Sequence, residues 1–217
     1  MKICVLGAGA WGTALAIHLG KLHPTKLWAR DSGHVSGMKK AQSNPLYLGD
    51  FKFPSNLDIS DDFNAALSDV DLIVCAVPTS GFRQILKSIN EINQLTPVIW
   101  ANKGLEKGSA KLPHEIAFEE LGDPKKTKRD WGVVSGPSFA AELVRALPTA
   151  LTLASTSKET TILAANIFHH DNLRVYTSQD VVGASVGGAL KNVIAIASGI
   201  SDGMGFGNNA RAALITR

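Results

Sequence analysis

Three closely spaced glycines follow the first apolar segment of the chain. Gly7, Gly9 and Gly12 come directly after residues 2–6 and open a helical pattern over residues 12–22. In such a setting Gly7 permits a tight turn, Gly9 lets a pyrophosphate approach the backbone, and Gly12 allows helix and strand to pack closely. The helix N-terminus offers unpaired N–H groups and a positive dipole end to phosphates. The motif therefore predicts a dinucleotide site, and glycines that serve only the turn are the alternative.

The second apolar segment, residues 25–29, is followed by Arg30 and Asp31, and these two side chains indicate which dinucleotide binds. An Asp or Glu there favours a free ribose 2′-hydroxyl, whereas an Arg accommodates a 2′-phosphate. Arg30 therefore tilts our prediction toward NADP, and Asp31 keeps NAD open. The simpler alternative is that Arg30 is a surface cation that stacks on adenine without discriminating.

Two later segments at strand ends predict a substrate site. Lys103 lies just beyond an apolar strand, at the edge where open α/β sheets bind ligands. Gly136, Pro137 and Ser138 follow another strand, and Pro137 suits the first turn of a helix that continues through residues 141–143. An accessible backbone at Gly136 and the Ser138 hydroxyl could hold an anionic or polyol substrate. A loop lysine and a plain helix start are the alternatives.

A third segment places a lysine on a glycine-lined helix face. Gly183, Gly187 and Lys191 recur every four residues, so they share one face of a helix. Helical glycines cost about 1 kcal/mol each relative to Ala, so we expect something to approach that face closely. Lysines are rarely buried without a role, so we expect Lys191 to be functional.

These segments need a scaffold of alternating strands and helices. We predict strands at residues 2–6, 25–29, 71–77, 96–101, 130–134 and 150–154, and helices at 12–22, 62–67 and 81–92. Alternation of this kind indicates βαβ units. The fold class is α/β, a Rossmann-like doubly wound, mainly parallel sheet, followed by the start of an all-α C-terminal domain. We place the dinucleotide-binding domain at residues 1–182 and the start of the helical domain at 183–217.

Composition excludes several classes of function. The 217 residues are 45% hydrophobic and carry a net charge of +3, which argues neither for disorder nor for nucleic acid as a partner. The basic cluster at residues 125–129 is most simply a solvated loop. Two cysteines, Cys4 and Cys75, lie in apolar strands, form no disulfide framework and favour a reducing compartment. The histidines are scattered, and we expect no metal site.

Residues 3–20 lack charged side chains, as a signal peptide would, but their glycines weaken that interpretation. Elsewhere we find no apolar run long enough to span a bilayer. At the other end, the helical pattern before Arg217 has no stop signal, so we expect the sequence to be a piece of a longer protein.

Several motifs together resemble the NAD(P)-dependent glycerol-3-phosphate dehydrogenase family, bacterial type, over the whole chain. The matching segments are residues 7–16, 44–48, 102–106, 135–142, 187–195 and 209–217. The Lys191-Asn192 segment and the final segment are specific to this family rather than to Rossmann domains at large. The family's later motifs, in a helical second domain that grips the substrate phosphate, do not occur here.

The resemblance implies a role for particular residues. Lys191 matches the proton acceptor, and Lys103 a lysine that touches both cofactor and substrate. Gly136 and Ser138 match substrate-binding positions. The implied cofactor contacts, besides the three glycines, are Ala10, Trp11, Arg30 and Ala140.

The reaction that the resemblance implies is the interconversion of sn-glycerol 3-phosphate and dihydroxyacetone phosphate with NAD(P). An ordinary lysine, with a pKa near 10.4, is a poor base at neutral pH. We therefore expect burial and Lys103 to assist Lys191. The resemblance also implies a cytoplasmic protein without a membrane span, whose product supplies phospholipid synthesis. A homodimer is left open. A related 2-hydroxyacid or ketopantoate-type reductase, a non-catalytic dinucleotide sensor and a weakly active cofactor-binding fragment are the alternatives.

Overall fold

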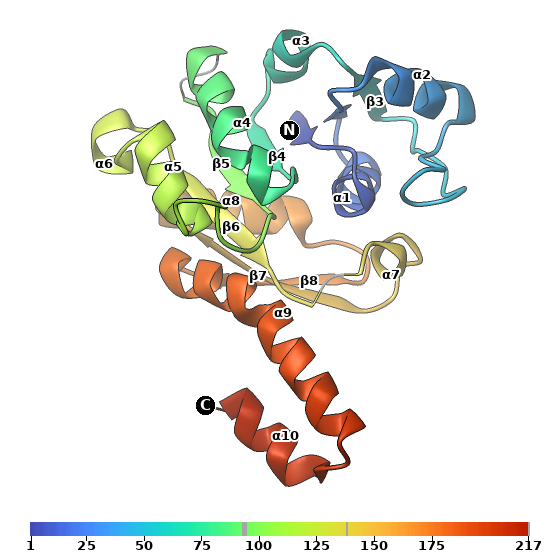
Figure 1. The fold of residues 1–217 in the computed structure, drawn as a ribbon. Helices are drawn as coiled ribbons and strands as arrows, with labels where there is room; N and C mark the ends of the chain where they lie inside the picture. The colour runs from blue at the N-terminus through green and yellow to red at the C-terminus, as the bar shows by residue number, and fades with distance from the viewer. Residues whose placement is uncertain (93–94, 138, 217) are drawn as a thin grey trace.

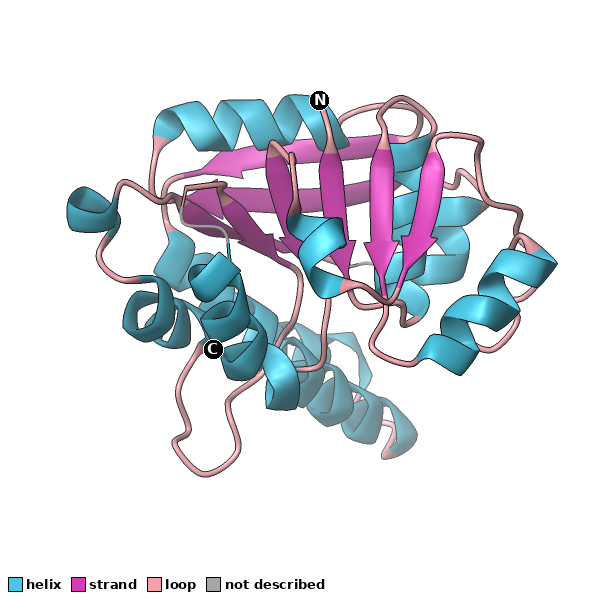
Figure 2. Cartoon of the chain, turned by 90° about the horizontal axis from the view of Figure 1, so that it is seen from above, coloured by secondary structure: helices cyan, strands magenta, loops and turns pink. Residues whose placement is uncertain are grey.

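The computed structural model describes residues 1–92, 95–137 and 139–216. Within these ranges eight strands form one sheet, covered by helices on both faces (Figures 1 and 2). The strands are β1 (Ile3–Leu6), β2 (Thr25–Trp28), β3 (Leu57–Ser60), β4 (Leu72–Cys75), β5 (Val98–Trp100), β6 (Trp131–Ser135), β7 (Thr149–Ser155) and β8 (Leu173–Ser178). The predicted α/β class is confirmed.

The strands lie in the order β3-β2-β1-β4-β5-β6-β7-β8. All neighbours pair in parallel except β6 and β7, which are antiparallel. The sheet is therefore mainly parallel, as predicted. Two strands that the sequence pattern did not reveal, β3 and β8, are its two edges.

The helices are α1 (Ala10–Gly20), α2 (Ser32–Ala41), α3 (Phe63–Leu67), α4 (Thr79–Ile92), α5 (Pro113–Leu121), α6 (Pro124–Thr127), α7 (Ala140–Val144), α8 (Lys158–Phe168), α9 (Val181–Gly203) and α10 (Gly207–Thr216). Helices α1 to α8 lie in the connections between strands, and α9 and α10 follow the last strand. The predicted helix at residues 81–92 is confirmed as part of α4, whose buried face carries Phe82, Leu86 and Ile89. Two apolar clusters, one on each face of the sheet, form the core.

The strand order reverses next to β1. The chain leaves β1 for β2 and β3 on one side and then returns to β4 on the other side. Parallel strands direct their carboxyl ends to one edge, and ligands of open α/β sheets bind at the point where the order reverses. The glycine-rich turn between β1 and α1 lies at this point.

Both cysteines are core residues. Cys4 in β1 and Cys75 in β4 are fully buried and free. Burial raises the pKa of each thiol to about 12. Their prediction as core side chains is confirmed, and neither is a nucleophile at neutral pH.

The two last helices differ from the rest. In Figure 1, α9 leaves the sheet and α10 folds back beside it. The expectation of no long apolar run beyond residue 20 was wrong, because α9 is long and apolar enough, by length and composition, to cross a membrane. Its valines, isoleucines, alanines and Leu190 make it apolar, and only 17% of the apolar window is buried.

Candidate functional site

The turn between β1 and α1 is built around its glycines. Gly7 has a φ of +106°, and a Cβ there would lie 2.9 Å from the carbonyl oxygen of Ala76. A Cβ at Gly12 would overlap the carbonyl oxygen of Gly7. These two positions therefore exclude side chains for backbone reasons alone, as the motif predicted.

Gly9 has a different environment. No described atom lies within 4 Å of a Cβ placed there, so the absence of a side chain leaves open space above the turn. Gly9 is the N-cap of α1, and no side chain caps the first turn, which begins at Ala10 and Trp11. The backbone N–H groups of that turn are thus available to an anion. This open cradle fits the pyrophosphate of a dinucleotide.

A buried asparagine holds the turn in place. Asn44 is fully buried, and its Nδ2 donates to the carbonyl oxygen of Ala8 (2.9 Å) and to Oγ1 of Thr13 (2.8 Å). Its Oδ1 lies 2.9 Å from Nε2 of His34. Sequence reasoning gave Asn44 no role beyond a matched motif. An Asn followed by Pro45 in a polar loop was the available signal, and the two groups to which it donates, on Ala8 and Thr13, lie more than 30 residues earlier in the chain.

Arg30 and Asp31 follow β2 at the same edge of the sheet. Arg30 is exposed. Asp31 is the N-cap of α2, and its Oδ1 accepts a hydrogen bond from the backbone N–H of His34 at 2.6 Å. One oxygen of the Asp31 carboxylate is therefore engaged in a structural role, and the side chains of Arg30 and Asp31 are both exposed at this strand end.

Lys103 comes directly after the buried segment, residues 98–102, that contains β5. Its half-buried ammonium donates to the carbonyl oxygen of Gly136 at 2.9 Å, so two predicted substrate-site segments meet here. Its own carbonyl oxygen accepts from Oγ1 of Thr79 at 2.8 Å. Burial, and secondarily the charge of Lys191, lowers the pKa of Lys103 to about 8. Lys103 therefore changes charge near neutral pH.

The loop that carries Lys103 is fixed to α4 by ion pairs. Arg83 donates from Nε and Nη2 to the two carboxylate oxygens of Glu106, at 2.8 and 2.7 Å. The guanidinium also pairs with Glu119 and Glu120 on α5. The Arg83 contact holds the pKa of Glu106 at about 2. A bidentate pair of this kind restricts the loop geometry more than a single contact would.

The segment after β6 departs from one expectation. Gly136 has a φ of +154° and lies against the carbonyl oxygen of Ala150, which explains the glycine. The predicted helix start at Pro137 was wrong: α7 begins at Ala140, with Phe139 as its N-cap. Pro137 belongs instead to the loop, and the N-cap Phe139 has an extended backbone. Ser138 lies outside the described residues.

The glycines of α9 also correct an expectation. No described atom lies within 4 Å of a Cβ placed at Gly187, and at Gly183 the three nearest atoms belong to the side chain of Asp180, the helix cap. The close approach is instead at Gly188, where a Cβ would lie 3.0 Å from Oγ of Ser135 and 3.5 Å from Cγ of Lys103. The four-residue spacing of the glycines predicted the close contact at Gly187, one residue before its actual position.

Lys191 lies one turn beyond this contact. It is half-buried, and its Nζ lies 5.8 Å from the centre of the Phe139 ring, within the range of a cation–π interaction. The packing of Gly188 on Ser135 and Lys103 thus brings α9 to the carboxyl edge of the sheet. The two lysines interact electrostatically there.

This fold and this edge define a Rossmann-type dinucleotide-binding protein. The family model described as NAD-dependent glycerol-3-phosphate dehydrogenase N-terminus matches residues 2–161, and the corresponding C-terminus model matches residues 180–217. The chain belongs to this family.

Individual relatives agree with the family models. The chain is 58% identical over its whole length to a protein from Methylobacillus flagellatus and 50% identical to one from Aromatoleum aromaticum, both named glycerol-3-phosphate dehydrogenase [NAD(P)+]. It covers 65% of the length of each, so it spans somewhat less than two thirds of these relatives.

Solved structures of similar fold include a member of the same family. The crystal structure of glycerol-3-phosphate dehydrogenase from Coxiella burnetii matches with a TM-score of 0.88 and 40% identity, over 99% of this chain and 65% of that one. A GDP-mannose dehydrogenase from Pseudomonas aeruginosa, at 17% identity and a TM-score of 0.65, shares the fold alone.

Proposed function

We propose that this chain binds NADP or NAD at the β1–α1 turn and interconverts sn-glycerol 3-phosphate and dihydroxyacetone phosphate. The observation that carries the proposal is the meeting of Lys103, Gly136 and α9 beside the open glycine cradle. The names of its relatives support the substrate. We place the dinucleotide-binding domain at residues 1–182, and the limits of the matching family models support a boundary near there.

The proposed division of labour follows from where the side chains lie. A bound nicotinamide would supply the hydride-transfer chemistry, and the residues of this chain would orient it and handle the proton. Lys191 accepts the hydroxyl proton of glycerol 3-phosphate and returns it to the ketone oxygen in the reverse direction. Lys103, charged below a pKa of about 8, attracts the anionic substrate and cofactor. The remaining proposed contacts are Gly7, Gly9, Ala10, Trp11, Gly12, Arg30 and Ala140 for the cofactor, and Gly136 and Ser138 for the substrate.

The setting that we propose follows from the family. Two buried free cysteines support a reducing, cytoplasmic compartment, and glycerol 3-phosphate would supply phospholipid synthesis. A homodimer is the assembly that we propose to test, by the mass of the chain in solution.

A substrate panel tests the proposed reaction. Oxidation of NADPH and NADH is followed with dihydroxyacetone phosphate, with ketopantoate and with a 2-keto acid. We expect turnover with dihydroxyacetone phosphate only. Faster turnover with a keto acid would contradict the proposal, and dinucleotide binding without any turnover would reduce the chain to a cofactor-binding unit.

The choice of dinucleotide is tested by Arg30→Asp. The exposed Arg30 and the engagement of Asp31 in capping α2 support NADP over NAD. We expect the ratio of NADP to NAD affinity to fall by about tenfold, the size of a lost ion pair of about 1.4 kcal/mol. Asp31→Asn, which keeps the cap, is the control. An unchanged ratio in Arg30→Asp would contradict the assignment.

A further inference from the structure

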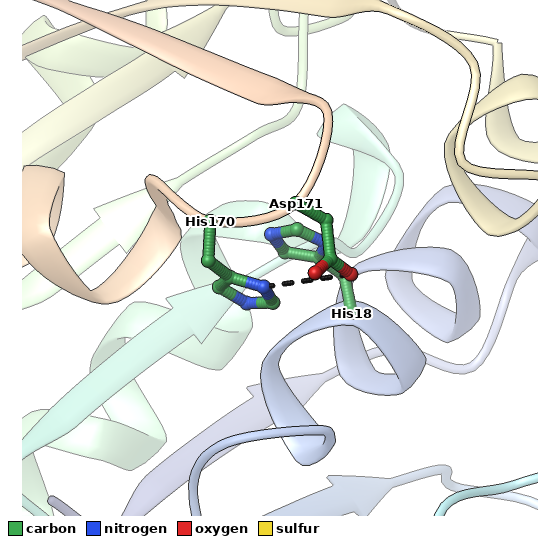
Figure 3. Close-up of side chains that lie close together, drawn as sticks. All are labelled: His18, His170 and Asp171. Carbon is green, nitrogen blue, oxygen red and sulfur yellow. Dashed lines mark ion pairs between the residues drawn. The ribbon is translucent and has the colours of Figure 1, made fainter.

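The fold brings His18 close to the adjacent residues His170 and Asp171, which lie about 150 residues later in the sequence. His18 is on α1, whereas His170 and Asp171 lie in the connection between α8 and β8 (Figure 3). One nitrogen or oxygen atom from each of the three lies within 4.8 Å of the other two. Spacing along the chain could not reveal this group, which lies outside the proposed dinucleotide site.

His18 is oriented as a metal ligand would be. Its Nε2 lies 2.9 Å from the carbonyl oxygen of Phe168. A carbonyl only accepts, so Nε2 carries the proton and Nδ1 of the neutral ring carries the lone pair. Metal-binding histidines characteristically donate their second ring nitrogen to a carbonyl or carboxylate in this way, which fixes the tautomer.

His170 is buried without the partners that its ring needs. Its side chain is only 10% exposed, and neither ring nitrogen makes a hydrogen bond within the described part of the chain. Its ring stacks on His18 at 3.6 Å, and Nδ1 lies 3.7 Å from Oδ2 of Asp171. Buried polar atoms are almost always satisfied, so both nitrogens call for a partner.

We propose that His18, His170 and Asp171 bind a divalent transition-metal ion of the zinc class. Two imidazole nitrogens and one carboxylate oxygen are ligands typical of such an ion, with water completing the shell. Parallel rings direct their lone pairs in parallel planes, so binding requires the His170 ring to turn. That rotation breaks no hydrogen bond of His170.

Lys21 is the competing cation. Its Nζ donates to Oδ2 of Asp171 at 2.8 Å, and its side chain is 37% exposed. A bound metal ion repels this ammonium, which can move into solvent. Loss of the Lys21 charge therefore strengthens metal binding.

The ion would join α1 to the α8–β8 connection. His18 lies eight residues after Ala10, about 12 Å along the helix axis from the glycine turn. A metal at His18 is too far from the turn to touch a pyrophosphate bound there. Its effect is therefore on stability rather than on chemistry.

The test uses the untagged chain after treatment with a chelator. Zn²⁺ is titrated in competition with a chromophoric chelator, and thermal unfolding is followed with and without the ion. We expect one equivalent to bind and the Tm to rise. His170→Ala and Asp171→Asn should each weaken binding at least tenfold and remove the Tm shift, while Lys21→Gln should tighten binding.

His169→Ala is the matched control, because His169 is adjacent, exposed and outside the group. Asp171→Asn guards against misfolding, since Asn tolerates the positive φ of 49° at that position. Equal affinity in the wild type, His170→Ala and Asp171→Asn, or no Zn²⁺ binding at all, would overturn the proposal.

Discussion

Two segments of this protein carry closely spaced glycines, and they use them differently. In the β1–α1 turn, Gly7 and Gly12 each meet a backbone carbonyl, and Gly9 faces open space. On α9, Gly187 also faces open space, and only Gly188 meets a neighbour from the sheet. Spacing alone therefore identifies a glycine-rich segment, but the packing decides which glycine is required.

The largest effect should come from the turn. Gly12→Ala places a methyl group on the carbonyl of Gly7, a backbone atom that cannot rotate away. We expect a loss of about 3 kcal/mol in the free energy of unfolding, measured by urea denaturation.

Gly9→Ala is the matched variant, because its methyl group meets no described atom. Its stability should stay within about 0.5 kcal/mol of the wild type, while dinucleotide affinity falls. Equal dinucleotide affinity in Gly9→Ala and the wild type would show that the pyrophosphate does not lie above the turn.

The lysine facing α9 should respond to pH. Because the pKa of Lys103 is lowered to about 8, its charge and its attraction for an anionic dinucleotide decline as pH rises through that value. We expect the Kd for NADPH to rise several-fold between pH 7 and 9 in the wild type and to change much less in Lys103→Met.

The lowered pKa of Lys103 also makes the stability of the fold depend on pH. Between about pH 8 and the unfolded value near 10.4, the unfolded chain binds more protons at Lys103 than the folded chain does. This group's contribution to stability therefore increases with pH across that window. A contribution that decreased there, judged against Lys103→Met, would contradict the burial of the ammonium.

The smallest effect should come from the glycines of α9. Gly187→Ala should raise the free energy of unfolding by up to about 1 kcal/mol, because Ala favours a helix and no described atom opposes its methyl group. At Gly188 the 3.0 Å approach to Ser135 should offset that gain. Urea denaturation of the two variants compares them, and an equal gain at both positions would remove the proposed contact between α9 and the sheet.

The central strands could be predicted because both faces of each are buried, which makes β1 and β4 continuous apolar runs. The edge strand β8 could not, because five of its six residues are exposed or only partly buried and its sequence pattern resembles that of a loop. Helix α2 was missed for a similar reason, since only Val35 and Met38 are buried in it.

The site residues divide in the same way. The turn and Lys103 follow from local order, since Gly7 comes directly after β1 and Lys103 comes three residues after β5. Their roles remain predictions. The support that Asn44 gives to the turn and the meeting of His18 with His170 depend on contacts across the fold, which no local pattern encodes.

Lys191→Ala tests the central claim most directly. NADPH oxidation with dihydroxyacetone phosphate is measured beside the Kd for NADPH. If Lys191 holds the proton, kcat should fall by about 10²- to 10⁴-fold while the Kd stays within about twofold. A kcat near that of the wild type would contradict the account and require another acid–base group.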